Sequence, residues 1–147
     1  MDKESISEKW RERFDFLSTH GLPGTPSYTK NYRTMKLGQR ISIGSNLYAF
    51  FFGFIYFCIL GLWKKGLVLF LGVAAIQAVL IAIETVTDTD MNAFSKGINI
   101  GYAFVCAHLV NTAYYLRTVK GVDSWNPFQG LTRKSAEALS KLPSRQY

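Results

Sequence analysis

Few side chains in this sequence are of a type that does chemistry, and they are not spaced as an active site requires. His20 and His108 are the only histidines, and Cys58 and Cys106 both lie in apolar runs without a CxxC or Cys/His pairing. Gly-x-Ser-x-Gly, HExxH, P-loop and dinucleotide-binding motifs are absent from the sequence. We therefore predict no catalytic residue, no metal site and no cofactor, and we do not expect an enzyme.

Polar side chains do occur inside the long apolar stretches, where they need partners. Gln77 lies in the middle of residues 66–86, and His108 and Asn111 share one helical face of residues 98–116, followed by Tyr114 and Tyr115. Polar groups at such depth face other helices and mark candidate functional positions. We predict a hydrogen-bonded cluster of Gln77, His108 and Asn111, and we consider a proton or ion pathway only as an alternative, since one histidine makes a poor relay.

The elements that must position these groups are two apolar runs. Residues 66–86 carry no charge before Glu84, and residues 98–116 contain only His108 as a group that titrates near neutral pH. Each run is long enough, as a helix, to cross roughly 30 Å of hydrocarbon. The sequence predicts an all-α membrane protein with two transmembrane helices, at about 66–86 and 98–116.

Small residues recur in both runs at helical spacing. Ala74, Ala78 and Ala82 repeat every four residues in the first run. In the second, Gly97 and Gly101 form a GxxxG, and Ala103 and Ala107 repeat the spacing. Such stripes let helix backbones approach closely in lipid. They favour packing of the two helices into a hairpin, with homo-oligomerisation as the alternative.

The segment 48-YAFFFGFIYFCILGLWKK-65 is apolar and aromatic and ends on two lysines. Eight Lys and Arg residues precede it and six follow the last apolar run, whereas the loop 87–97 contains only Lys96. If the segment crossed the membrane, basic residues would be balanced across the bilayer; if it re-enters, nearly all lie on one side, as the positive-inside tendency requires. We predict a re-entrant or interfacial helix at about 46–63, with both termini cytoplasmic. Its candidate interaction residues are Phe50, Phe51, Phe52, Gly53, Trp63, Lys64 and Lys65.

The flanking regions contain two further predicted helices. Trp10, Phe14 and Leu17 follow helical spacing in an amphipathic helix at about 5–19, and a short basic helix is predicted at 132–142. Trp125 lies in an aromatic turn that we expect at the headgroup level. The chain therefore divides into a basic cytoplasmic region (1–45), a membrane domain (46–120) and a basic tail (121–147). The net charge of +7 indicates contact with anionic headgroups on the cytoplasmic side, not with nucleic acid.

Several blocks of sequence are similar to a known family. They are 9-KWRERFDFLSTHG-21, 46-NLYAFFFGFIYF-57 with 61-GLWKK-65, 111-NTAYYLRTVKG-121 and 124-SWNPF-128. Together they resemble small inner-membrane proteins of gammaproteobacteria that carry a domain of unknown function. The resemblance implies a multi-pass protein of the bacterial inner membrane. Many members have Gly-Pro where this chain has Gly53-Phe54, so a softer kink is expected at that point.

These observations favour a non-catalytic accessory or interaction protein. Its expected partners are membrane lipid and a larger membrane-protein complex or a second copy of the chain. Two alternatives are a membrane immunity or exclusion protein and a component of a small oligomeric transporter or channel. A channel requires oligomers, because two spanning helices cannot enclose a pore alone.

Overall fold

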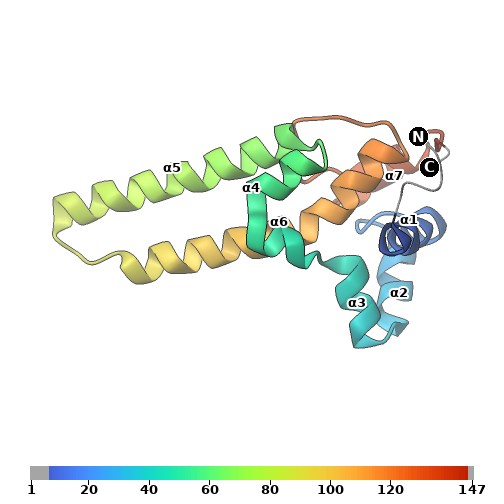
Figure 1. Cartoon of the computed structure of the whole chain (residues 1–147), viewed down its shortest axis with the longest axis horizontal. Coiled ribbons are helices and arrows are strands. Elements are labelled where there is room, and N and C mark those ends of the chain that lie inside the picture. The colour runs from blue at the N-terminus through green and yellow to red at the C-terminus, as the bar shows by residue number, and fades with distance from the viewer. Residues whose placement is uncertain (1–6, 146–147) are drawn as a thin grey trace.

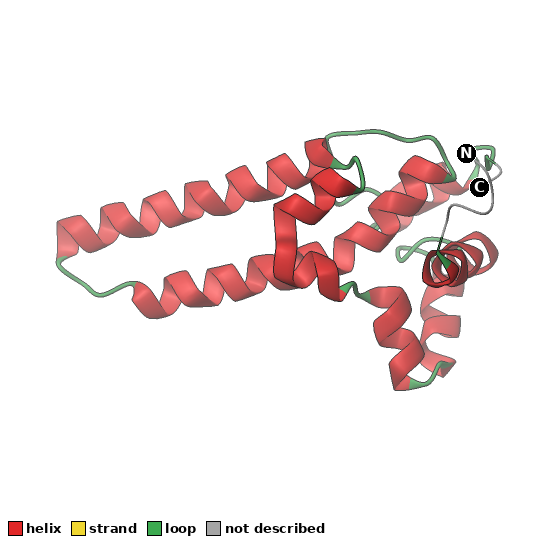
Figure 2. Ribbon diagram, viewed as in Figure 1, coloured by secondary structure: helices red, strands yellow, loops and turns green. Residues whose placement is uncertain are grey.

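The computed structural model describes residues 7–145, and the regular elements in this range are α-helices, as the sequence predicts. They are α1 (Glu8–His20), α2 (Pro26–Thr34), α3 (Leu37–Gly44), α4 (Leu47–Ile59), α5 (Trp63–Thr87), α6 (Asn92–Thr118) and α7 (Arg133–Ser140). The two longest, α5 and α6, form an antiparallel hairpin (Figure 1). The short helices α1, α2, α3 and α7 gather at the end opposite the hairpin turn, and α4 lies against the hairpin near that end (Figure 2).

Three predicted helices agree closely with the structure, and two helices were missed. The run 66–86 lies within α5, the C-terminal helix is α7, and α1 corresponds to the amphipathic helix predicted at 5–19, whose first two residues lie outside the described range. The helices α2 and α3 occupy a stretch predicted only to lead into the membrane. The start of α2 has a clear signal, because Thr25 caps the backbone N–H of Tyr28 and Pro26 takes the first helical position.

Two helical stretches are long and apolar enough to cross a membrane. They are Trp63–Thr87, which is α5, and Leu37–Ile59, which joins α3 to the aromatic helix α4. The predicted second span at 98–116 is not one of them. The helix α6 has the necessary length, but it carries more polar residues than α5. The stretch Leu37–Ile59 is also not one straight rod, because Ser45 and Asn46 have extended backbone angles and separate α3 from α4.

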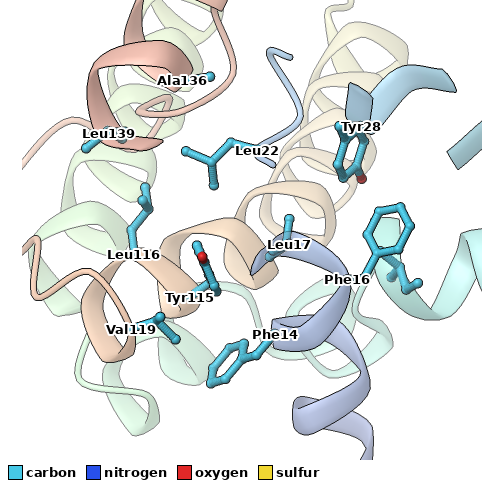
Figure 3. Packing of buried hydrophobic residues seen from close by; sticks show 11 residues of the cluster. Phe14, Phe16, Leu17, Leu22, Tyr28, Tyr115, Leu116, Val119, Ala136 and Leu139 are labelled. Atoms are coloured by element: carbon cyan, nitrogen blue, oxygen red, sulfur yellow. The ribbon is translucent and has the colours of Figure 1, made fainter. Parts of the chain in front are cut away.

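The C-terminal half of α6 is enclosed by protein. From Cys106 to Leu116 most of its side chains are buried, and α1, α3, α4 and α7 pack around them. Figure 3 shows the larger cluster, in which Phe14 and Leu17 of α1 meet Tyr115 and Leu116 of α6. The predicted span therefore begins six residues too late, and its second half contacts other helices of the chain.

The small-residue stripes do not form the contact between α5 and α6. A Cβ atom built on Gly97 or Gly101 would meet nothing within 4 Å, and Ala74 and Ala78 are exposed. For these residues the prediction that the stripes pack the hairpin is wrong, whereas Ala107 of the second stripe is buried. Instead, the longer side chain of Gln77 on α5 forms hydrogen bonds with Asn99 and Ser95 on α6.

Candidate functional site

The aromatic helix α4 reverses direction at Gly53. This residue has φ 45° and ψ −120°, a combination open to glycine and strained for other L-residues. The first arm of α4 runs along α6 from Asn46, whose N–H donates to Ala107 O, to Phe50, whose ring lies 5.1 Å from that of Phe104. The second arm returns beside α5 (Figure 1). The positive φ of Gly53 reverses the chain without a proline.

The returning arm ends in a Schellman motif that positions the two lysines. Gly61 has φ 71°, its N–H donates to Cys58 O, and the N–H of Leu62 donates to Phe57 O. Leu62 and Phe57 are both fully buried, which supplies the apolar contact typical of this motif. The chain then enters α5 at Trp63, so Lys64 and Lys65 fall in its first turn.

Both lysines bind the segment that follows α6. Lys64 Nζ forms an ion pair with Asp123 at 2.7 Å. Lys65 is only 1% exposed, and its Nζ donates to Asn126 O at 2.9 Å and to Ser124 Oγ at 3.2 Å. The hydrogen bond from Lys64 holds the pKa of Asp123 below its usual value. The start of α5 is therefore tied to residues 123–129 by one partly exposed ion pair and one buried ammonium group.

Trp63 and Trp125 form a pair beside these lysines. Their rings make an edge-to-face contact at 5.4 Å, and each residue is about half exposed, 47% for Trp63 and 51% for Trp125. The sequence predicted both residues as candidates but gave no reason to pair them.

Asn46 and Asn111 form the buried polar centre of the helical junction. Asn46 Nδ2 donates to Asn111 Oδ1 at 3.2 Å, and Asn111 Nδ2 donates to Ile43 O at 2.9 Å. Asn46 Oδ1 also accepts from the N–H groups of Tyr48 and Ala49, which caps α4. Two amide side chains thus fix the angle at which α4 leaves α3, and Asn46 is a residue that the sequence analysis missed.

The predicted cluster of Gln77, His108 and Asn111 does not form. Gln77 Nε2 instead donates to Asn99 Oδ1 and to Ser95 O, both at 3.2 Å, and Gln77 Oε1 accepts from Ser95 Oγ. His108 is exposed; its Nδ1 donates to Phe104 O, and Ser45 Oγ lies 3.3 Å from its Nε2. Gln77 therefore joins α5 to the first turns of α6, far along the hairpin from Asn111.

The aromatic residues divide into an exposed group and a group that packs against other helices. Phe51 and Phe52 are 74% and 56% exposed, whereas Phe50 contacts Phe104. At the other end of α6, Tyr114 lies 4.7 Å from the ring of Trp10, and Tyr115 is buried and accepts a hydrogen bond from Ser18 Oγ. Tyr114 and Tyr115 thus hold α1 against α6, and Phe51 and Phe52 remain free to contact something else.

The chemistry of these groups is that of packing and ion pairing. Within residues 7–145 no three His, Cys, Asp or Glu side chains converge in a way that could hold a metal ion. Cys106 is buried, and Cys58 is exposed on the returning arm of α4. The arrangement can recognise apolar surfaces and anions, through exposed aromatic side chains and buried cations.

Comparison with known proteins confirms the family that the sequence blocks indicate. The profile described as "Protein of unknown function (DUF2628)" matches residues 2–120. The uncharacterized protein YigF of Salmonella typhimurium is 37% identical over 139 residues, covering 86% of this chain and 99% of its own length. YigF of Escherichia coli K12 is 37% identical over 132 residues, covering 86% and 95%. No solved structure matches. On this evidence the chain belongs to the DUF2628 family of proteins of unknown function.

Proposed function

We propose that this protein is a non-catalytic interaction protein of the bacterial inner membrane. In this proposal the hairpin of α5 and α6 crosses the bilayer, and α4 enters the cytoplasmic leaflet and leaves it on the same side. The helices α1, α2, α3 and α7 form a cytoplasmic head that seats the second half of α6. The exposed aromatic face of α4 and the basic head then contact lipid and a larger membrane complex.

The reversal of α4 at Gly53 is the observation that carries this proposal. If α4 were straight, Lys64 and Lys65 would lie on the far side of the membrane from residues 123–129. Instead the two arms of α4 bring these lysines back to Asp123 and Asn126. The start of α5 and the segment after α6 therefore meet at one basic, polar head. This supports a location of the regions before α5 and after α6 on the same side of the membrane.

The distribution of exposed side chains supports a bilayer boundary near the start of α5. Between Lys65 and Glu84 the outer surface of α5 is apolar, with exposed Leu71, Ile76 and Val79 among others. The half-exposed pair of Trp63 and Trp125 has the amphipathic character of residues at headgroup level. Lys96 is exposed on α6 within this apolar zone, and its long side chain can extend toward the outer surface.

Cysteine labelling of the full chain tests this topology. In a background in which Cys58 and Cys106 are replaced by serine and alanine, single cysteines are introduced as Trp63→Cys, Thr89→Cys and Lys134→Cys. We expect a membrane-impermeant maleimide to label position 89 on intact spheroplasts, and positions 63 and 134 only after lysis. Labelling of position 63 from outside would show that α4 crosses the membrane and would refute the re-entrant arrangement.

Affinity purification in detergent tests the interaction role. A stoichiometric membrane-protein partner, lost with Phe51→Ala and Phe52→Ala but retained with Gly97→Ala, supports an accessory protein that docks through α4. A strict monomer without a partner contradicts both this role and an oligomeric channel. Recovery of a toxin or phage protein instead supports the immunity alternative.

A further inference from the structure

A cavity of about 280 Å³ lies between α1, α3 and the first turn of α4. Lys9, Trp10 and Arg13 line it from α1, and Ser42 and Tyr48 line it from the other side. Two cations and the aromatic rings of Trp10, Tyr48 and Tyr56 thus meet in one hollow. No acidic side chain is found among the described residues that line it, so the cavity is suited to an anion.

Arg13 is fixed in this cavity with donors to spare. It is 9% exposed, its Nε donates to Ser42 O at 2.8 Å, and its guanidinium carbon lies 4.6 Å from the centre of the Trp10 ring. These contacts orient the planar group, and a guanidinium has four further N–H donors. The carboxylates of Asp123 and Glu137 form ion pairs with Lys64 and Arg133. Burial lowers the pKa of Arg13, which reflects the cost of keeping this cation from water.

The cavity lies at the level where α5 begins. Gln77 marks the register of the hairpin, because it contacts Ser95 and Asn99. Counting about 16 Å from Gln77 toward the head, at 1.5 Å per residue, reaches Gly66 on α5 and residue 108 on α6. Asn46 borders the cavity, and its backbone N–H donates to Ala107 O. The cavity therefore lies at the same height along the hairpin axis as Gly66 and residue 108.

The mouth of the cavity is apolar. Ile41, Leu47 and Tyr48 line the cavity and yet are 50%, 65% and 63% exposed. From Tyr48 the exposed surface continues to Phe51 and Phe52 on the same arm of α4. A ligand that fits must therefore combine an anionic group of modest size with a long apolar part that leaves the cavity.

We propose that this cavity binds one anionic phospholipid, with the headgroup phosphate on Arg13 and the acyl chains over Ile41 and Leu47. The proposal rests on the proposed membrane location, which places the cavity at the boundary of the cytoplasmic leaflet. Arg13 acts as a phosphate clamp, because its planar fork matches two phosphate oxygens and Trp10 and Ser42 O prevent it from turning away. Lys9 supplies a second, mobile charge.

Native mass spectrometry of the full chain in neutral detergent tests this site. We expect one phosphatidylglycerol molecule to remain bound under conditions that strip phosphatidylcholine. Arg13→Gln should weaken phosphatidylglycerol binding by about 10- to 100-fold, the loss expected for charged hydrogen bonds. The matched control Arg33→Gln removes an equal charge from the exposed surface of α2 and should leave the affinity unchanged.

A second variant covers the possibility that Arg13→Gln disturbs folding. Ile41→Glu puts a carboxylate at the exposed mouth of the cavity and should abolish phosphatidylglycerol binding without lowering the melting temperature. Equal retention of both lipids, or wild-type affinity in folded Arg13→Gln and Ile41→Glu, would overturn the proposal. Glycerol 3-phosphate or inorganic phosphate binding as tightly as phosphatidylglycerol would overturn it in favour of a soluble ligand. Lipid binding is measured in detergent and membrane topology by cysteine labelling. A negative result for the lipid site can therefore be told apart from a negative result for the proposed topology.

Discussion

Replacement of Gly53 by alanine tests whether the reversal of α4 is built into the sequence. At φ 45° and ψ −120° an L-residue is strained, at a cost of roughly 1–3 kcal/mol. The added Cβ would also lie 3.1 Å from Tyr102 Cε1, closer than normal contact, so the ring must shift. The smaller entropy of an unfolded chain with alanine offsets about 0.4–1 kcal/mol. We therefore expect a net destabilisation of about 2 kcal/mol.

The assay is thermal unfolding of the purified protein in detergent, followed by circular dichroism. For a chain of this length, about 2 kcal/mol corresponds to a fall in melting temperature of roughly 4–8 °C. The matched control is Gly72→Ala, since Gly72 lies within helix α5 and a Cβ there would meet nothing within 4 Å. That variant should be neutral or slightly stabilised, because alanine favours helix more than glycine does.

A second measurement, maleimide labelling of a cysteine at position 63, reports whether α4 still reverses direction in Gly53→Ala. Alanine at position 53 favours a continuous helix, which would carry Lys64 and Lys65 away from Asp123 and expose a cysteine at position 63 to new surroundings. A Gly53→Ala protein with unchanged melting temperature and unchanged labelling of position 63 would refute the reasoning. It would mean that the reversal does not depend on the positive φ of Gly53.

Three further predictions concern the head of the molecule. Asn111→Leu should destabilise the protein by about 2–4 kcal/mol in the same melting assay, because it leaves a buried carbonyl and a buried amide without their partner; a loss below 0.5 kcal/mol would contradict this. The ion pair of Lys64 and Asp123 should contribute above pH 4 and be lost as pH falls, since the lowered pKa of Asp123 favours its charged form in the folded state. Its contribution should stay below about 1 kcal/mol because both groups are partly exposed, and a melting curve between pH 3 and pH 6, compared with Lys64→Gln, measures it. Phe14→Ala should cost about 3–5 kcal/mol, whereas Phe51→Ala, at an exposed position, should cost little in detergent.

The sequence predicts the helices well and their register poorly, and Gln77 shows why. A predicted loop at 87–97 places Gln77 opposite residue 107, close to His108. In the structure α6 already begins at Asn92, so Gln77 faces Ser95 and Asn99 instead. Polar residues such as Asn92 and Ser95 lower the hydropathy of a stretch without preventing a helix. The boundary therefore depends on tertiary partners that a one-dimensional pattern does not contain.

Arg13 and Asn46 show two different reasons for a missed site. Asn46 directly precedes an apolar run, and asparagine there is a typical helix cap, so its role was readable from the sequence. Arg13 lies three residues after Trp10 and so shares its face of α1, but the charge of an arginine would ordinarily assign it to solvent. Its burial results from Ser42 and the Trp10 ring, which α3 and α1 bring together only in the folded chain.

The two lysines that end the aromatic segment have different physical roles. Lys64 is partly exposed and pairs with a carboxylate, so water and salt can replace its partner at little cost. Lys65 is fully buried and bound by neutral oxygens, including Asn126 O, so these acceptors must be in place to offset the cost of its burial. A buried ammonium group without acceptors is far costlier than one with three. The burial of Lys65 thus penalises any arrangement in which α4 fails to return, and it selects the reversed path of the chain more strongly than the exposed ion pair does.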